Sequence, residues 1–96
     1  MASSKEYRDY ILEQLSHLNP TYKSMMGEFL IYVNGVYFGG IFDNRLLVKI
    51  TDTNSKYQLP IQLPYDNAKP MYLVENVDDH EYLESLVIDT IKGLKL

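Results

Sequence analysis

Residues 29–50 read FLIYVNGVYFGGIFDNRLLVKI, and this stretch decides the fold. The aromatic and β-branched residues that favour strands form three runs in it, Phe29–Val33, Val36–Phe42 and Arg45–Ile50. Asn34-Gly35 separates the first two runs and is the strongest short hairpin signal, because both turn positions need a positive φ. Asp43-Asn44 provides the second tight turn. Turns this short leave no room for a crossover, so the sequence predicts an antiparallel three-strand meander.

A pair of glycines, Gly39-Gly40, lies in the middle of the second predicted strand. Glycine inside a strand often marks a bulge or a close approach between helix and sheet, where a side chain would collide, and we expect one of these here. A ligand lying across the bare backbone is the alternative. The strands carry apolar residues on both faces. We therefore expect helices on one face, with the other face partly covered or used as an interface.

A helix is predicted before the meander, over residues 4–18. Ser3 and Glu6 have the spacing of a capping box, and apolar residues then recur at helical spacing as far as Leu18. Asn19-Pro20 stops the helix, because proline disfavours the α conformation in the residue before it.

A second helix is predicted at the end of the chain. Asp78 and Glu81 repeat the capping pattern, and an amphipathic stripe follows from Leu83 to Leu94. Gly93 lies where we expect this helix to end.

The stretch between the meander and the last helix holds smaller elements. A short helix capped by Thr51 or Thr53, an edge strand over 61–65 and a strand over 70–74 are expected. The predicted fold class is α+β, in the order α-β-β-β-(short α)-β-β-α. The antiparallel-rich sheet has four to five strands, begins with the meander, and is flanked by the two terminal helices.

Composition indicates one domain over residues 1–96, because 96 residues leave no room for a second core. The chain has no cysteine, which excludes disulfides and thiolate ligands and fits the cytoplasm. We expect neither a signal peptide nor a membrane-spanning segment, because no apolar stretch follows the basic residues near the N-terminus and no apolar run reaches membrane-spanning length. The net charge is −4 and the basic residues are scattered, which argues against direct binding of DNA or RNA.

No pattern in the sequence indicates catalysis, and we expect no enzyme, metal or cofactor. His17 and His80 are the two histidines, and neither has a second ligand at metal-binding spacing. No serine lies in the glycine-flanked elbow of a hydrolase, and Gly39-Gly40 lacks the following helix that a phosphate-binding loop needs.

Arg45 and Lys49 are the most interesting polar residues of the meander. They are four positions apart on one strand and therefore project from the same face, where they could bind an acidic partner or an anion. The alternative is that they form surface ion pairs with Glu28 and Asp43, each contributing roughly 0–1 kcal/mol.

Three blocks together resemble the N-terminal domain of the TfoX/Sxy competence-regulator family: Met25–Phe29, Phe38–Lys49 and Pro64–Met71. The resemblance spans nearly the whole chain. It implies a helix, a meander, a short helix, more strand and a closing helix, with the sheet flanked by helices on one side. Longer members carry a helical C-terminal domain, which we expect this chain, ending at Leu96, to lack.

What the resemblance implies for function is a non-catalytic regulatory or protein-interaction module, associated with control of DNA-uptake genes in bacteria. The expected partner is another protein, and homodimerisation stays open. The motif positions carried over as a candidate interaction surface are Gly27, Glu28, Gly39, Gly40, Asp43, Arg45, Lys49, Lys69 and Pro70. The alternative is a small-ligand-binding protein or enzyme that uses the sheet face around Gly39, Gly40, Arg45 and Lys49.

Overall fold

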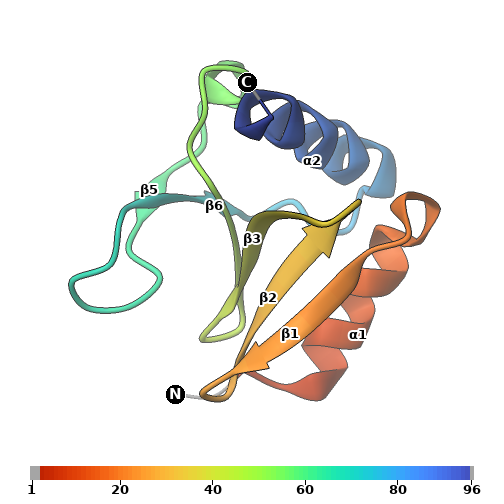
Figure 1. The fold of residues 1–96 in the computed structure, drawn as a ribbon, viewed down its shortest axis with the longest axis vertical. Coiled ribbons are helices and arrows are strands. Elements are labelled where there is room, and N and C mark those ends of the chain that lie inside the picture. The colour runs from red at the N-terminus through yellow and green to blue at the C-terminus, as the bar shows by residue number, and fades with distance from the viewer. Residues whose placement is uncertain (1–2, 96) are drawn as a thin grey trace.

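The predicted meander forms the centre of a larger antiparallel sheet in the computed structural model, which describes residues 3–95 (Figure 1). Within these residues the sheet has six strands in the order β1-β2-β3-β4-β6-β5, and every neighbouring pair is antiparallel. The strands are β1 (Thr21–Met25), β2 (Glu28–Val33), β3 (Val36–Phe42), β4 (Arg45–Val48), β5 (Ile61–Gln62) and β6 (Met71–Val74).

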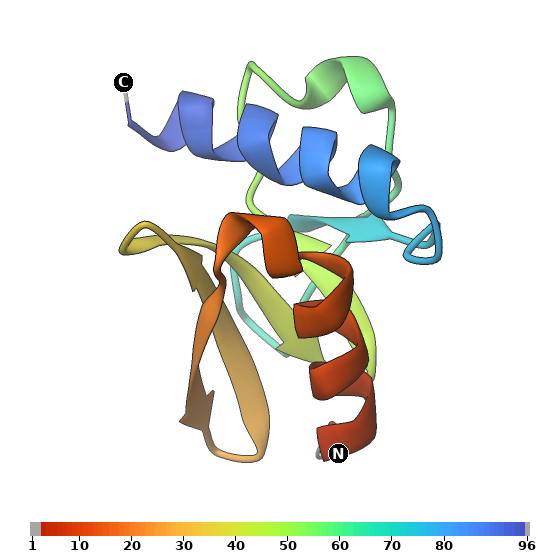
Figure 2. The same cartoon turned by 90° about the vertical axis from the view of Figure 1, so that its right-hand side faces the viewer.

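Two α-helices, α1 (Lys5–Gln14) and α2 (His80–Leu94), lie on the same side of the sheet (Figure 2). Short 3-10 turns follow α1 and β4, namely η1 (Ser16–Leu18) and η2 (Ser55–Tyr57). The α+β class, the meander and the flanking terminal helices are thus confirmed. The sheet has more strands than the expected four to five.

The main core lies between the helices and one face of the sheet. Ile11 of α1 and Leu86 of α2 are fully buried there, together with Ile31, Phe38 and Ile41 from β2 and β3. Each such side chain stabilises the fold by about 1.5–3 kcal/mol when it is fully buried. The helical stripes predicted from the sequence are therefore the faces that pack on the sheet.

The bulge expected near the glycine pair is present. Ile31 pairs with Gly39 but the next residue, Tyr32, pairs with Tyr37, so Phe38 is the extra residue of β3. Gly39 also sits against β4. A Cβ atom there would overlap the carbonyl oxygen of Leu47 and lie 2.9 Å from the Cα of Val48. The close approach is between strands, not between helix and sheet as one reading of the sequence suggested.

Strand β1 lies between the predicted helix over residues 4–18 and the strand expected from Phe29, where the sequence predicts no element. The sequence of β1, TYKSM, does not alternate between apolar and polar residues, and all five residues are exposed. The strand therefore gives no periodic signal that would predict it. Met26 and Gly27 turn the chain into β2 with φ angles of 52° and 86°. The guanidinium of Arg8 lies 4.6 Å from the centre of the Tyr22 ring and so links α1 to this edge strand.

Both predicted helix caps are wrong by one residue. Ser4 caps α1 by accepting from the amide of Tyr7, whereas the Ser3 hydroxyl donates to Glu28 at 2.6 Å. Asp79 caps α2, whereas Asp78 accepts from the hydroxyl of Tyr10. In each case the residue predicted as the cap instead forms a hydrogen bond with another element, Ser3 with Glu28 and Asp78 with Tyr10. The local spacing of residues does not predict such contacts.

The helix ends also differ from the prediction. The α-helical part of the first helix stops at Gln14, and η1 continues to Leu18. Gly93 lies inside α2, which ends at Leu94. A Cβ atom on Gly93 would lie 2.6 Å from the Cβ of Thr51, so this glycine lets the 51–53 segment approach the helix.

Tyr57 ties η2 to α2. Its hydroxyl donates to Asp89 at 2.7 Å, and Lys56 pairs with the same carboxylate at 3.2 Å. Burial and the hydrogen bond to Asp89 raise the pKa of Tyr57 to about 12. The hydrogen bond from Tyr57, more than the nearby lysines, lowers the pKa of Asp89 from its usual 3.8.

We expect Tyr57→Phe to lower the free energy of unfolding by about 1 kcal/mol at neutral pH, the contribution of one hydrogen bond. In the wild type this contribution is fully present above 3.8 and below 10.0, the ordinary pKa values of Asp89 and Tyr57. It disappears as the pH falls through the lowered pKa of Asp89 or rises through the raised pKa of Tyr57. Urea unfolding of both proteins across this range tests it. A difference that did not change with pH would contradict the assignment.

Candidate functional site

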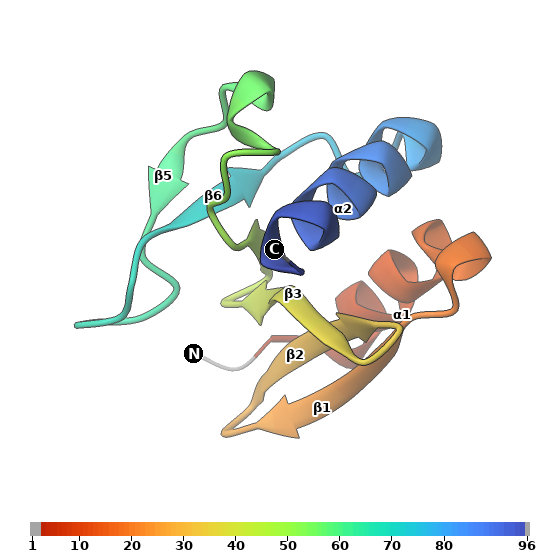
Figure 3. The same ribbon diagram turned by 45° about the horizontal axis from the view of Figure 1, so that its top comes forward.

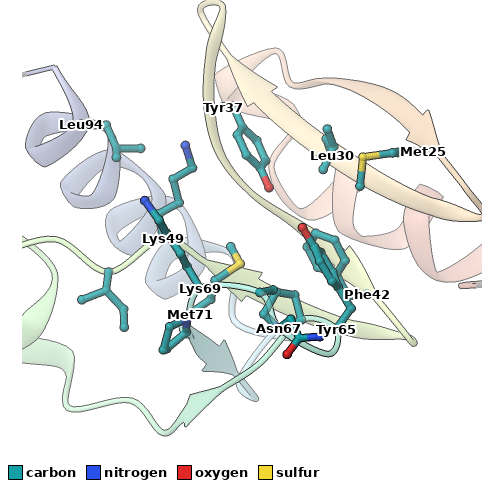
Figure 4. A pocket seen from close by; sticks show the side chains of 14 residues that line it. Met25, Leu30, Tyr37, Phe42, Lys49, Tyr65, Asn67, Lys69, Met71 and Leu94 are labelled. Carbon is teal, nitrogen blue, oxygen red and sulfur yellow. The ribbon is translucent and has the colours of Figure 1, made fainter.

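The sheet face opposite the helices carries a second, smaller apolar cluster with an open cavity beside it (Figure 4). Phe42, Leu47 and Met71 are buried in this cluster, and Leu30 and Leu73 pack against it. The cavity has a volume of about 880 Å³. We call this cavity the groove. Its lining comes from β1, β2, β3, the two residues that follow β4, the 63–70 loop, β6 and the end of α2.

The groove is lined mainly by apolar side chains. Leu30, Phe42 and Met71 come from three different strands and form its inner surface. Met25 of β1 and Ile50 after β4 lie nearer to solvent, with 37% and 42% of their surfaces exposed. Apolar surface left open on a folded domain is typical of a binding site.

The polar lining consists of two lysines, two tyrosines and an asparagine: Lys49, Lys69, Tyr37, Tyr65 and Asn67. None of the residues that line the groove in the described part of the chain is acidic. The ammonium of Lys49 lies 4.2 Å from the centre of the Tyr37 ring, within the range of a cation–π interaction. Burial, followed by the neighbouring Tyr65 and Tyr32, raises the pKa of Tyr37 above its ordinary value.

Arg45 holds the outer wall of the groove. Its guanidinium donates to the side chain of Gln62 at 2.7 Å and to the carbonyl oxygens of Leu63 and Pro64 at 3.2 Å each. These bonds fix the start of the loop that connects β5 to β6. Figures 1 and 3 show this loop reaching out beyond the strands, away from α1. Arg45 therefore shapes the groove but does not line it.

A buried asparagine, Asn54, fixes the backbone of Lys49 by a hydrogen bond. Asn54 is fully buried and donates to the carbonyl oxygen of Lys49 and to the hydroxyl of Thr90, both at 2.8 Å. The amide of Lys49 donates to the carbonyl oxygen of Phe38 at 2.8 Å. The backbone of Lys49 is thus fixed on both sides, and α2 takes part in positioning it.

The nine residues carried over from the resemblance do not gather on one surface. Only Lys49, Lys69 and Pro70 line the groove. Gly39 and Gly40 lie within β3, where the neighbouring strands approach them closely.

Three further members of that set hold the N-terminal segment. Glu28 accepts from the amide and hydroxyl of Ser3 and from the amide of Asp43, all within 2.9 Å. The carbonyl oxygen of Gly27 accepts from the same Ser3 amide at 3.0 Å. Glu28 and Asp43 therefore serve the fold at this point, and within residues 3–95 neither forms an ion pair with Arg45 or Lys49. The surface ion pairs suggested by the sequence are absent because the two basic residues have other contacts.

The groove residues that the sequence did not indicate are mostly apolar, for example Met25, Leu30 and Ile50. Apolar residues on both faces of the strands were the available signal, because they indicated a second face that needs cover. The position of the 63–70 loop determines which of these apolar residues remain exposed to solvent. The spacing of residues along the chain does not predict where this loop lies.

A smaller hollow lies between the end of α1 and the start of α2. The structure brings His17 and His80 together there, with ring centres 6.1 Å apart, and His17 pairs with Glu84 at 3.0 Å. Spacing along the chain gave no sign of this contact. Among residues 3–95 no group of three or more histidine or carboxylate side chains has a metal-binding arrangement. The same residues include no helix with the length and apolar character needed to cross a membrane.

Comparison with known proteins places the chain in a family. It is 30% identical over 80 residues to the "Uncharacterized 12.7 kDa protein in trpE 5'region" of Spirochaeta aurantia, an alignment that covers 80% of this chain and 70% of that protein. This chain belongs to the same family. The spirochaete relative is named for its size and genomic position, so the family carries no activity over to this chain. No protein-family model matches the chain.

Proposed function

We propose that this protein is a non-catalytic binding module and that the groove is its recognition surface. One observation carries the proposal: an apolar cavity of about 880 Å³ on the open sheet face contains two lysines and, among the described residues, no carboxylate. Ligand sites in proteins are usually concave, mostly apolar and of about 300–1,000 Å³, with a few polar groups that orient the ligand.

The polar groups of the groove support binding more than catalysis. A general base needs a pKa near the working pH, and a nucleophile needs a neighbouring base. Tyr37 has its pKa raised, which moves it away from that range. Lys49 rests against the ring of Tyr37, an arrangement that suits a fixed positive charge.

The resemblance to the TfoX/Sxy N-terminal domain supports a regulatory role for this module, with a protein as partner and the cytoplasm as its location. The three blocks that carry the resemblance all contribute to the groove: the first provides Met25, the second Phe42 and Lys49, and the third Lys69 and Met71. A shared surface is therefore a consistent reading of the resemblance. A homodimer through the exposed edge strand β1 belongs to the same set of proposals.

A small-ligand-binding role is the second candidate, and the volume of the groove favours it. Of the four residues expected to surround such a site, only Lys49 lines the groove. Gly39, Gly40 and Arg45 do not line it. The proposed site moves from the glycine pair to the space between Lys49, Lys69 and Phe42.

We expect Ile50→Glu to weaken probe binding in the groove. Ile50 lines it with 42% of its surface exposed, whereas Ile88 of α2 has a similar exposure of 39% and lies outside it. A carboxylate at position 50 puts a charge into an apolar wall, so the affinity for anilinonaphthalene sulfonate or its neutral analogue phenylnaphthylamine should fall by roughly tenfold or more. The measurement is a fluorescence titration with each probe.

Ile88→Glu is the matched control and should bind both probes as the wild type does. Circular dichroism and a thermal melt establish that both variants are folded. If neither probe binds the wild-type protein, or if both variants lose binding equally, the groove is not a binding site and the proposal is wrong.

A further inference from the structure

We infer that the groove binds a small amphiphilic organic anion, with its apolar part against Met25, Leu30 and Ile50 and its acidic group at Lys49 and Lys69. This inference rests on the groove proposed above as the recognition surface, in its small-ligand role, and specifies the class of ligand. Figure 4 shows the two lysine side chains between Leu94 on one side and Leu30, Tyr37 and Phe42 on the other.

Charge is the first argument. The whole chain carries a net charge of −4, yet the two charged residues among the described lining of the groove are both lysines. Within residues 3–95, neither ammonium lies within ion-pair distance of a carboxylate. A local positive charge in an acidic protein attracts anions to this cavity and leaves the rest of the surface unfavourable for them.

Preorganisation is the second argument. Lys49 has its backbone fixed by Asn54 and Phe38, and its ammonium is held against the ring of Tyr37. A side chain already held in place loses less conformational entropy when a ligand binds. Tyr37 also lines the groove, and its hydroxyl adds a hydrogen-bond donor for an acidic group.

The apolar surface is the third argument, because it excludes a simple inorganic anion as the best ligand. Met25 and Ile50 line the groove with much of their surfaces exposed, above the buried Phe42 and Met71. A phosphate or sulfate ion would leave this apolar surface uncovered. Methionine adapts its shape readily, and Met25 and Met71 lie on different strands of this surface. The ligand therefore needs an apolar body of several carbon atoms as well as one acidic group.

Two probes with the same ring system separate charge from apolar contact. Anilinonaphthalene sulfonate carries an acidic group, and phenylnaphthylamine lacks it. If the groove recognised ligands by apolar contact alone, it would bind the neutral probe more tightly, because that probe is more hydrophobic than the sulfonate. We expect the sulfonate to bind at least about tenfold more tightly, a ratio that one or two charge-assisted contacts supply. Its affinity should fall as salt is added.

The lysines are tested by Lys49→Met and Lys69→Met, which keep the apolar stem and remove the charge. Each should weaken sulfonate binding by roughly five- to tenfold and leave the affinity for the neutral probe within about twofold. Lys5→Met changes the net charge equally on α1, away from the groove, and should have no effect on either probe. Lys49→Arg and Lys69→Arg should retain most of the affinity.

The outcomes distinguish this inference from the proposed function. If both probes bind equally and the lysine variants change nothing, the groove is a binding site but does not select anions. If neither probe binds, the proposed site itself is wrong. If light scattering gives the mass of a dimer that the sulfonate dissociates, a second copy of the chain occupies the groove and the inference of a small ligand is overturned.

Discussion

Gly39→Ala is expected to lower the free energy of unfolding by about 3 kcal/mol, at the upper end of the usual cost of overpacking. The new Cβ would overlap the carbonyl oxygen of Leu47 and approach the Cα of Val48, and both are backbone atoms of β4. A backbone neighbour cannot change rotamer to make room. The β3–β4 ladder, which pairs Gly39 with Val48, would have to separate locally.

Gly35→Ala is the matched control for this prediction. Gly35 occupies the first hairpin with a φ of 77°, and a Cβ there would meet nothing within 4 Å. Its substitution adds only backbone strain, which costs about 1 kcal/mol. Urea unfolding of the two variants separates the steric effect from the conformational one. Equal destabilisation of the two variants would show that β4 does not press on Gly39.

Asn54→Ala is expected to lower the free energy of unfolding by about 3 kcal/mol, because it leaves buried polar partners without a hydrogen bond. Asn54 donates to the carbonyl oxygen of Lys49 and the hydroxyl of Thr90, and accepts from the amide of Thr51 at 3.0 Å. Asn54 and Thr90 are both completely buried, so water cannot replace the missing groups without a rearrangement.

A double-mutant cycle with Thr90→Val isolates the contact between the two side chains. We expect a coupling energy of about 1 kcal/mol between positions 54 and 90. Thr90→Ser keeps the hydroxyl and should preserve the coupling. Additive effects of Asn54→Ala and Thr90→Val would mean that the hydrogen bond between them contributes nothing, and that α2 does not support Lys49 through Asn54.

The meander was predictable because its information is local. Asn34-Gly35 and Asp43-Asn44 both adopt the positive φ angles that their turns need, at 53° and 77° for the first pair and 54° and 55° for the second. Strand β1 carries no comparable signal, because its side chains are all exposed and its pairing with β2 is set by the Met26-Gly27 turn. The residue types of a tight turn can be recognised in the sequence, whereas an exposed edge strand has no sequence pattern that predicts it.

The groove was only partly predictable for a related reason. Lys49 was singled out because strand geometry alone placed it on one face with Arg45. The role of Arg45 in holding residues 62–64 is not local, since its acceptors lie 17 to 19 positions away along the chain. Asn54 was equally hidden. It lies in a polar stretch where the sequence predicts a short helix capped by Thr51 or Thr53. In the structure Asn54 itself precedes η2 and is buried between β4 and α2.

The proposed groove is tested most directly by mapping the bound sulfonate probe on the protein with amide chemical shifts in solution. The account predicts that the largest shifts occur at residues of the groove on separate elements, Leu30, Tyr37, Lys49 and Lys69, and that Ile50→Glu reduces them. Shifts centred on the hollow between α1 and α2, around His17 and His80, would contradict it. The absence of any amide shift at the groove residues when the protein is saturated with the probe would also contradict it.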